Sequence, residues 1–234
     1  MDNRHDDLTR FYKLLDALQQ KLGGLHILSE CNTRMKWSLR GVYFFMEVGE
    51  KRSSDENGLR IVRVGTHALA SGSKSTLWGR LSQHKGQIKT GGGSHRGSIF
   101  RLLIGTAIIN KTGLSFPTWG YKNTAKGDIR KNEEKMEQEV SKIIGAMPFL
   151  WLPINDESSP QSLRGYIERN SIALLSNLAK EVIDPPSPDW LGNYCNRKLV
   201  RDSGLWNQRH TNEEYDRNFL DVMEKLVNEV EGRP

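Results

Sequence analysis

The sequence lacks acidic residues over a long central stretch. No Asp or Glu occurs between Asn57 and Gly127, although the 234-residue chain contains 28 acids in all. The same stretch holds eleven cations, which are Arg60, Arg63, Lys74, Arg80, Lys85, Lys89, Arg96, Arg101, Lys111, Lys122 and Lys126. Because a region of one charge sign attracts ions of the other, we expect a polyanionic partner for this part of the chain.

Cysteine and long apolar runs are also scarce. Cys31 and Cys195 are the two cysteines, and neither stands in a CxxC motif, so the sequence predicts no disulfide framework and favours a reducing cytoplasm. The first residues lack the basic and apolar regions of a signal peptide. No apolar run approaches the roughly 20 residues that a membrane-spanning helix needs. We therefore expect a cytoplasmic protein with no membrane partner.

The residues that are present are typical of a folded domain. Apolar residues make up 36% of the chain and charged residues 26%, an ordinary balance for a globular protein. Alternating apolar residues predict strands at 41–48 and 59–65, joined as a hairpin. A third strand is expected near 98–109, and residues 149–154 are either a short strand or a buried loop.

Helical spacing of apolar residues predicts five helices. They cover about 6–22, 76–85, 128–146, 160–180 and 212–231. Together with the strands, these helices indicate an α/β protein in which a small mixed or antiparallel sheet is flanked by helices.

Five short elements follow one another in a definite order along these predicted strands and helices. Gly41–Tyr43 opens the first strand, and Arg63–Gly65 closes the second. Arg80 and His84 are i, i+4 neighbours on one helix, and Glu168 lies on a later helix. In this order the residues resemble the GIY-YIG nucleases, which include homing endonucleases, excision-repair incision subunits and some type II restriction enzymes.

The resemblance covers residues 41–178 and implies a division of the chain. A nuclease domain would occupy 41–180, with an insertion around 110–154. A helical extension at 1–40 would precede it, and a C-terminal extension at 181–234 with the final helix would follow.

The resemblance also implies a metal-dependent endonuclease that hydrolyses DNA. Tyr43 would accept or relay the proton of the attacking water. Arg80 would clamp the scissile phosphate with its guanidinium fork, and His84 would assist proton transfer or bind phosphate. Glu168 would hold one divalent cation, Mg²⁺ or Mn²⁺, which stabilises the leaving oxyanion.

The pattern of its helix singles out Glu168 independently. A carboxylate that heads an apolar row on a largely buried helix is costly unless it meets a cation. The alternatives are that Glu168 lies at an exposed end of the row or pairs with an arginine. Because the stretch from His84 to Glu168 is longer than in compact family members, Glu137 and Glu139 stay as fallback metal ligands. The two apolar rows consist of Leu163, Ile167, Leu174 and Leu178, and of Ile172, Leu175 and Ala179.

Arg63 departs from the family pattern, because a tyrosine normally begins the second signature. The guanidinium either replaces the phenol as a phosphate contact or marks a dead site. In the second case the chain would be a catalytically inactive DNA- or RNA-binding module on the same fold. A structural role in a nucleoprotein assembly is a third alternative, and the sequence leaves open whether the protein forms a homodimer.

Basic residues around the motifs are expected to contact nucleic acid. They are Arg63, His67, Lys74, Lys85, His95 and Arg96. The glycine-rich loop 91–97, which carries the last two, is either a surface turn or a backbone cradle for phosphate.

The C-terminal tail combines cations with aromatic residues. This composition suits phosphate contact and base stacking. The alternative is a tail that packs on the core through Trp190, Leu205 and Trp206. The residues concerned are Arg197, Lys198, Arg201 and Arg209, interleaved with Tyr194, Trp206 and His210.

Overall fold

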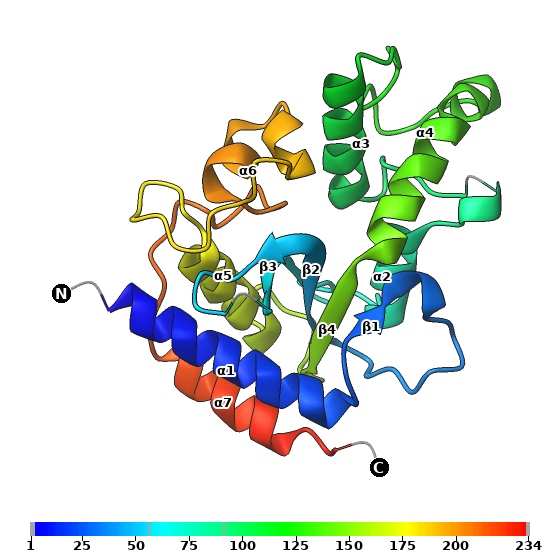
Figure 1. The fold of residues 1–234 in the computed structure, drawn as a ribbon. Coiled ribbons are helices and arrows are strands. Elements are labelled where there is room, and N and C mark those ends of the chain that lie inside the picture. The colour runs from blue at the N-terminus through cyan, green and yellow to red at the C-terminus, as the bar shows by residue number, and fades with distance from the viewer. Residues whose placement is uncertain (1–2, 56, 91, 233–234) are drawn as a thin grey trace.

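Four antiparallel strands form the centre of the protein. The computed structural model describes residues 3–55, 57–90 and 92–232. The order across the sheet is β1-β4-β2-β3, and each neighbouring pair runs antiparallel (Figure 1). The predicted α/β fold with a small sheet flanked by helices is confirmed, and the sheet is antiparallel throughout. The strands are β1 (His26–Ile27), β2 (Gly41–Lys51), β3 (Leu59–Gly65) and β4 (Pro148–Pro153).

Seven α-helices in the described residues surround this sheet. In Figure 1, α1 and α7 lie side by side below the sheet, whereas α2, α3 and α4 lie on its other side. None of the helices among the described residues is both long enough and apolar enough to cross a membrane. The helices are α1 (Arg4–Leu22), α2 (Leu77–Lys85), α3 (Ile99–Thr112), α4 (Gly127–Ala146), α5 (Leu163–Leu175), α6 (Lys198–Ser203) and α7 (Phe219–Glu229), with short 3-10 turns at Leu28–Glu30, Ile88–Thr90 and Leu191–Tyr194.

The alternation of side chains along β2 divides the core into two layers. Phe44 packs against Phe11 of α1, with ring centroids 5.9 Å apart. Phe45 points to the opposite face and packs against Phe100 of α3 at 5.5 Å. All four rings are fully buried. The α3 face of the sheet is the one that carries the candidate site.

Residues 99–109 belong to helix α3 and Ser98 is its N-cap, so the expected third strand near 98–109 is wrong. The run is apolar and rich in β-branched residues, which makes it hard to distinguish from a buried strand by composition. Ser98 begins the helix, because its hydroxyl accepts a hydrogen bond from the backbone N–H of Arg101. The side chains that reach the core recur at helical intervals, at Phe100, Leu103, Ile104 and Ala107.

Two later helices are shorter than expected. Helix α5 begins after Ser162, whose side chain caps it, rather than at Pro160. Helix α7 begins only at residue 219, because residues 212–218 form an irregular segment in which Arg217 binds Asp7 of α1 at 2.7 Å. The apolar segment expected as a short strand or a buried loop at 149–154 is strand β4.

Candidate active site

A cavity of about 470 Å³ lies beside the Gly65 end of β3. Four residues of the motifs found in the sequence line it, namely Tyr43, Arg63, Arg80 and Glu168. They come from β2, β3, α2 and α5, so the fold brings together side chains that are far apart along the chain. The other lining residues are Thr66, Leu69, Ile99, Leu103, Ile172, Asn207, Gln208, Arg209 and His210.

The two signature glycines allow close approaches that a larger residue would prevent. A Cβ atom on Gly41 would lie 2.5 Å from the carbonyl oxygen of Leu152 on β4. A Cβ atom on Gly65 would lie 2.5 Å from Cζ of Tyr43. Both separations are shorter than Cβ atoms tolerate, so Gly65 is needed for the Tyr43 ring to cross from β2 over β3.

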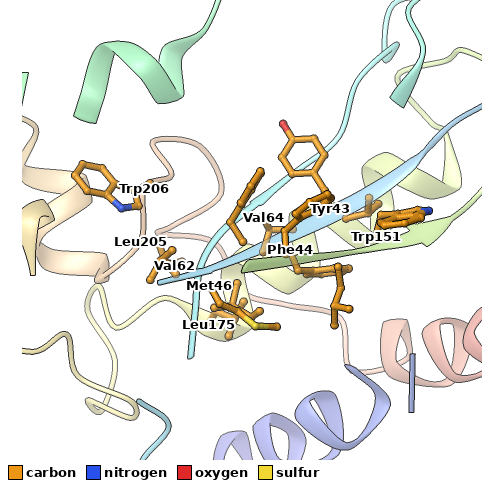
Figure 2. Close-up of a cluster of buried hydrophobic side chains, with 14 of the residues drawn as sticks. Tyr43, Phe44, Met46, Val62, Val64, Trp151, Leu175, Leu205 and Trp206 are labelled. Carbon is orange, nitrogen blue, oxygen red and sulfur yellow. The ribbon is translucent and has the colours of Figure 1, made fainter. Parts of the chain in front are cut away.

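Tyr43 begins a chain of three polar groups that runs into the protein interior. Figure 2 shows its hydroxyl pointing away from Phe44, on the face of the sheet that carries the cavity. The hydroxyl oxygen lies 2.8 Å from Nε2 of His84. Nδ1 of the same imidazole lies 2.7 Å from the hydroxyl oxygen of Ser98. The phenol is therefore held in place from behind.

His84 lies behind Tyr43 rather than in the cavity. Its side chain has no exposed surface. Burial lowers the pKa of His84 well below its ordinary value, and the nearby charges of Arg80 and Arg63 lower it further. The imidazole is consequently neutral, and it can orient Tyr43 or accept its proton. Direct contact with phosphate, the other role expected for His84, does not fit an enclosed side chain.

Glu168 is the one acidic side chain among the described residues that line the cavity. Its Oε1 accepts a hydrogen bond of 3.0 Å from the backbone N–H of Thr66. Burial raises the pKa of Glu168 above its ordinary value, and the charges of Arg63 and His210 offset part of this effect. A carboxylate in such surroundings is stabilised by a bound cation.

The two fallback acids lie elsewhere. Glu137 accepts a hydrogen bond of 2.9 Å from Nε of Arg101 and is also bound to His95. Glu139 pairs with Lys142 at 2.6 Å on the surface. Neither acid lines the cavity.

Arg63 is held rigidly on the same face of the sheet as Tyr43. The strand register pairs Arg63 with Phe45, and its guanidinium carbon lies 4.7 Å from the centre of the Phe100 ring. Its Nη1 donates a hydrogen bond to the carbonyl oxygen of Trp206. Burial lowers the pKa of Arg63, while the neighbouring Tyr43 favours its charged form. Arg63 is therefore a fixed part of the cavity wall.

Arg80 is tied to neutral partners only through Nη1. This atom donates to Oε1 of Gln83 at 3.1 Å and to the carbonyl oxygen of Gly97 at 3.2 Å. The side chain lines the cavity and is half-buried. Because its partners are neutral, the charge of Arg80 is available to an anionic substrate.

Two residues of the glycine-rich loop are not placed as the sequence suggested. His95 is buried, with Nδ1 2.9 Å from Glu137 and its ring stacked on Trp119. Arg96 forms a salt bridge of 2.6 Å with Glu133. A hollow of about 350 Å³ beside this loop carries both charge signs, which does not suit a polyanion. The acids of α4 thus neutralise cations that have no acidic neighbour in sequence.

The other expected contacts lie in three different settings. Lys74 is exposed. Lys85 donates from Nζ to the carbonyl oxygen of Cys31 at 2.6 Å and does not line the cavity. His67 is buried, and burial together with the charge of Arg164 lowers its pKa to about 4, so it is neutral at neutral pH.

The tail reaches the cavity through a segment that we call the C-terminal strap, Trp206–His210. The backbone N–H of Trp206 donates to the carbonyl oxygen of Val62 at 2.7 Å. The side-chain amide of Asn207 pairs with the backbone of Val64, as a neighbouring strand would. Oδ1 of Asn207 accepts a hydrogen bond of 3.2 Å from the N–H of Val64, and Nδ2 donates one of 2.8 Å to the carbonyl oxygen of Val64. The strap therefore covers the free edge of β3 and delivers residues 207–210 to the cavity.

The strap is anchored from the other side by a carboxyl group. Oε2 of Glu47 accepts hydrogen bonds from the indole nitrogens of Trp190 at 3.1 Å and Trp206 at 3.3 Å. Both indoles are buried, as expected for a tail packed on the core. The sequence pointed to Arg209 and His210 as substrate contacts, but it gave no separate signal for Asn207 or Gln208.

The cavity suits a divalent cation bound through one carboxylate. The described residues contain no group of three or more His, Cys, Asp or Glu that could enclose a metal ion. Mg²⁺ keeps several of its waters and is commonly held by one or two carboxylates together with phosphate oxygens of the substrate. Glu168 fits that requirement, because its carboxylate is half-buried and the neighbouring cations offset only part of the effect of burial on its pKa.

Comparison with known proteins adds an independent finding. A family model described as the GIY-YIG domain matches residues 2–233, which is nearly the whole chain. No curated protein and no solved structure matches the chain.

Proposed function

The chain belongs to the GIY-YIG family, and from that premise we propose that it is a metal-dependent endonuclease that hydrolyses phosphodiester bonds of DNA. Family membership by itself indicates nuclease activity in general. The observation that supports the finer proposal is the cavity in which the phenol of Tyr43, the guanidinium groups of Arg63 and Arg80 and the carboxylate of Glu168 meet.

Tyr43 and His84 activate the attacking water in this proposal. Tyr43 takes a proton from the water while its own proton passes to Nε2 of the neutral His84, 2.8 Å away. Nδ1 of His84 then carries the other imidazole proton and donates to Ser98. The water oxygen bonds to phosphorus, and the bond from phosphorus to the leaving oxygen breaks.

The two arginines stabilise the charge that develops on the phosphate. Arg80 offers donors to the non-bridging oxygens because its partners within the protein are neutral. Arg63 adds a second positive charge in a fixed position, where reorganisation during the reaction costs little. In this role Arg63 compensates for the tyrosine that usually begins the second signature.

Glu168 would hold the divalent cation, Mg²⁺ or Mn²⁺. The chemistry that such a cation supplies is Lewis-acid stabilisation of the leaving oxygen. The backbone N–H of Thr66 fixes one carboxylate oxygen of Glu168 and so orients the other.

The direct test is cleavage of supercoiled plasmid by the purified protein with and without Mg²⁺. We expect nicked or linear DNA only when the metal is present. Glu168→Gln should slow cleavage by at least about a hundredfold, the usual effect of losing one group that stabilises transition-state charge. The same variant should still bind DNA, as measured by gel shift in EDTA. Normal turnover by Glu168→Gln would assign the metal to another acid.

Arg63 also supports one alternative, a catalytically inactive nucleic-acid-binding module. In that case the wild type would bind DNA or RNA with the salt dependence of a polyanion complex. It would nick no DNA form in Mg²⁺ or Mn²⁺. Gain of cleavage in Arg63→Tyr would then identify this position as the cause.

A further inference from the structure

Gln208 presents a buried hydrogen-bond donor that the protein itself does not use. Its amide nitrogen Nε2 is inaccessible to solvent and has no hydrogen-bond partner among the described residues. The side chain lines the cavity. Buried polar groups in native proteins are nearly always paired, because an unpaired donor loses its bonds to water without replacement. The donor is therefore accounted for if a ligand in the cavity supplies the acceptor.

The position of Gln208 is fixed by its neighbours in the strap. Asn207 holds both backbone groups of Val64. Trp206 is bound through its backbone N–H to Val62 and through its indole to Glu47. These anchors fix the backbone beside Gln208 and keep its side chain at the cavity, and fixed positioning favours a substrate-contacting group.

Arg63 carries a second unused donor in the same cavity wall. Its Nε is buried and has no hydrogen-bond partner among the described residues. Its Nη1 is bound to the carbonyl oxygen of Trp206, so the strap holds Arg63 and Gln208 in one unit. The cavity wall therefore holds two N–H donors without a partner in the described part of the chain, one on Gln208 and one on Arg63. Arg80 and Arg209 add positive charge to the same cavity, and this combination favours an anion with oxygen acceptors.

We propose that the side-chain amide of Gln208 donates a hydrogen bond to a non-bridging oxygen of the scissile phosphate, so that the C-terminal strap supplies a catalytic residue. This assignment rests on the proposed nuclease function. Gln208 acts beside Arg63, and the two together replace the single phenol of the usual second signature. The amide stabilises the phosphate as its negative charge grows in the transition state.

The test uses Gln208→Met, which keeps a similar volume and lacks the donor, and Gln208→Ala as a second variant. The cleavage site on a duplex oligonucleotide is first mapped with the wild type. Single-turnover rates are then measured at saturating enzyme. Each variant should cleave more slowly, by up to about a hundredfold, with a dissociation constant close to that of the wild type. Gln138→Ala on α4, which does not line the cavity, is the matched control and should cleave at the wild-type rate.

Sulfur substitution distinguishes contact from structural support. Duplexes carry one non-bridging sulfur at the scissile phosphate, in either configuration. Sulfur is a weak acceptor, so the wild type should cut one isomer more slowly because its bond to Gln208 is weakened. In Gln208→Met this difference should shrink, because the contact is already absent. A merely structural role would leave the sulfur effect unchanged.

The outcomes separate this inference from the proposed function. A wild type that cuts no DNA contradicts the nuclease proposal itself. A wild type that cuts, with Gln208→Met and Gln208→Ala at its rate or with unchanged sulfur effects, overturns the role of Gln208 alone. Loss of rate together with loss of the sulfur effect supports it.

Discussion

Glu47 connects the central sheet to the tail through a single carboxylate oxygen. That oxygen accepts hydrogen bonds from the indoles of Trp190 and Trp206. Burial raises the pKa of Glu47 above its ordinary value, and the two indole N–H groups offset part of the increase. The folded protein therefore binds a proton at Glu47 more readily than the unfolded chain does.

This linkage predicts how stability changes in Glu47→Gln. The penalty for ionising Glu47 in the folded state is absent well below the unfolded pKa of about 4.3 and develops as pH rises through the folded pKa. The amide oxygen of Gln can still accept from the indoles. Glu47→Gln should thus melt higher than the wild type at pH 7, with a difference that vanishes toward pH 3. Thermal unfolding followed by circular dichroism measures this difference.

Glu47→Ala is the comparison that isolates the hydrogen bonds. It removes the acceptor and leaves two buried indole N–H groups, so the free energy of unfolding should fall by about 1–3 kcal/mol. If Glu47→Gln melted below the wild type at neutral pH, the raised pKa would not be a source of instability.

The candidate site shows which residues sequence reasoning can reach. Tyr43, Arg80 and Glu168 were identified because their order along the chain matches a family pattern, and all three line the cavity. Asn207 and Gln208 carry no such pattern. They reach the cavity because the side-chain amide of Asn207 pairs with the edge of β3. A single contact of this kind leaves no periodic pattern of residues in the sequence.

The salt bridge of Arg96, which the sequence does not predict, has a similar physical origin. A stretch without acids shows only that no acid is close in sequence. Salt bridges form between residues that are close in space, and these can be far apart along the chain. Glu133 lies on α4, 37 residues further along, and neutralises Arg96. Glu137 of the same helix neutralises Arg101.

At the scale of elements, periodicity located most of the fold. Strands β2 and β3 and helices α1, α2 and α4 were predicted to within a few residues, because one face of each is apolar at the proper interval. The sequence predicts a strand where helix α3 lies, because apolar residues occur on most of the helix surface and weaken the helical signal. The cap at Ser98 was the feature that could have identified it.

The pairing of β2 with β3 predicts the effect of Gly65→Ala. The added methyl group would occupy the space of the Tyr43 ring, so the ring must shift and lose its bond to His84. Cleavage should fall by about a hundredfold or more, as for loss of a catalytic proton acceptor. The free energy of unfolding should fall by about 1–3 kcal/mol because of overpacking. Single-turnover cleavage and urea unfolding measure the two effects.

Gly127→Ala is the matched control for this substitution. Nothing lies within 4 Å of a Cβ atom at Gly127, which begins α4. Its rate should equal that of the wild type. Equal rates for Gly65→Ala and the wild type would show that the position of the Tyr43 ring does not limit cleavage.

At the scale of the whole molecule, the positive charges divide into two classes. Some form salt bridges within the protein, as Arg60 does with Glu50 and Arg96 with Glu133. Others, such as Lys74, are exposed. Counterion release on DNA binding depends on the second class, because a cation that keeps a carboxylate partner displaces no counterion from phosphate.

Two alanine variants compare these classes directly. If Lys74 contacts a phosphate, Lys74→Ala should reduce the slope of the logarithm of DNA affinity against the logarithm of salt concentration by about 0.9. Arg96→Ala should leave the slope unchanged and lower the free energy of unfolding, because it strands the buried Glu133. Fluorescence anisotropy of a labelled duplex in EDTA over a range of salt gives both slopes. A reduced slope in Arg96→Ala alone would show that Arg96, and not Lys74, contacts a phosphate.

The strap along β3 has a consequence for the order in which the protein is made. A ribosome extends the chain from its N-terminus, so β2, β3, α2 and α5 emerge before Trp206–His210. Until Asn207 has been synthesised, the backbone N–H and C=O groups of Val64 at the sheet edge must form hydrogen bonds with water. A nascent chain therefore has a cavity with one wall missing. Residues 207–210 line the cavity, so the candidate site is complete only after synthesis has passed the strap.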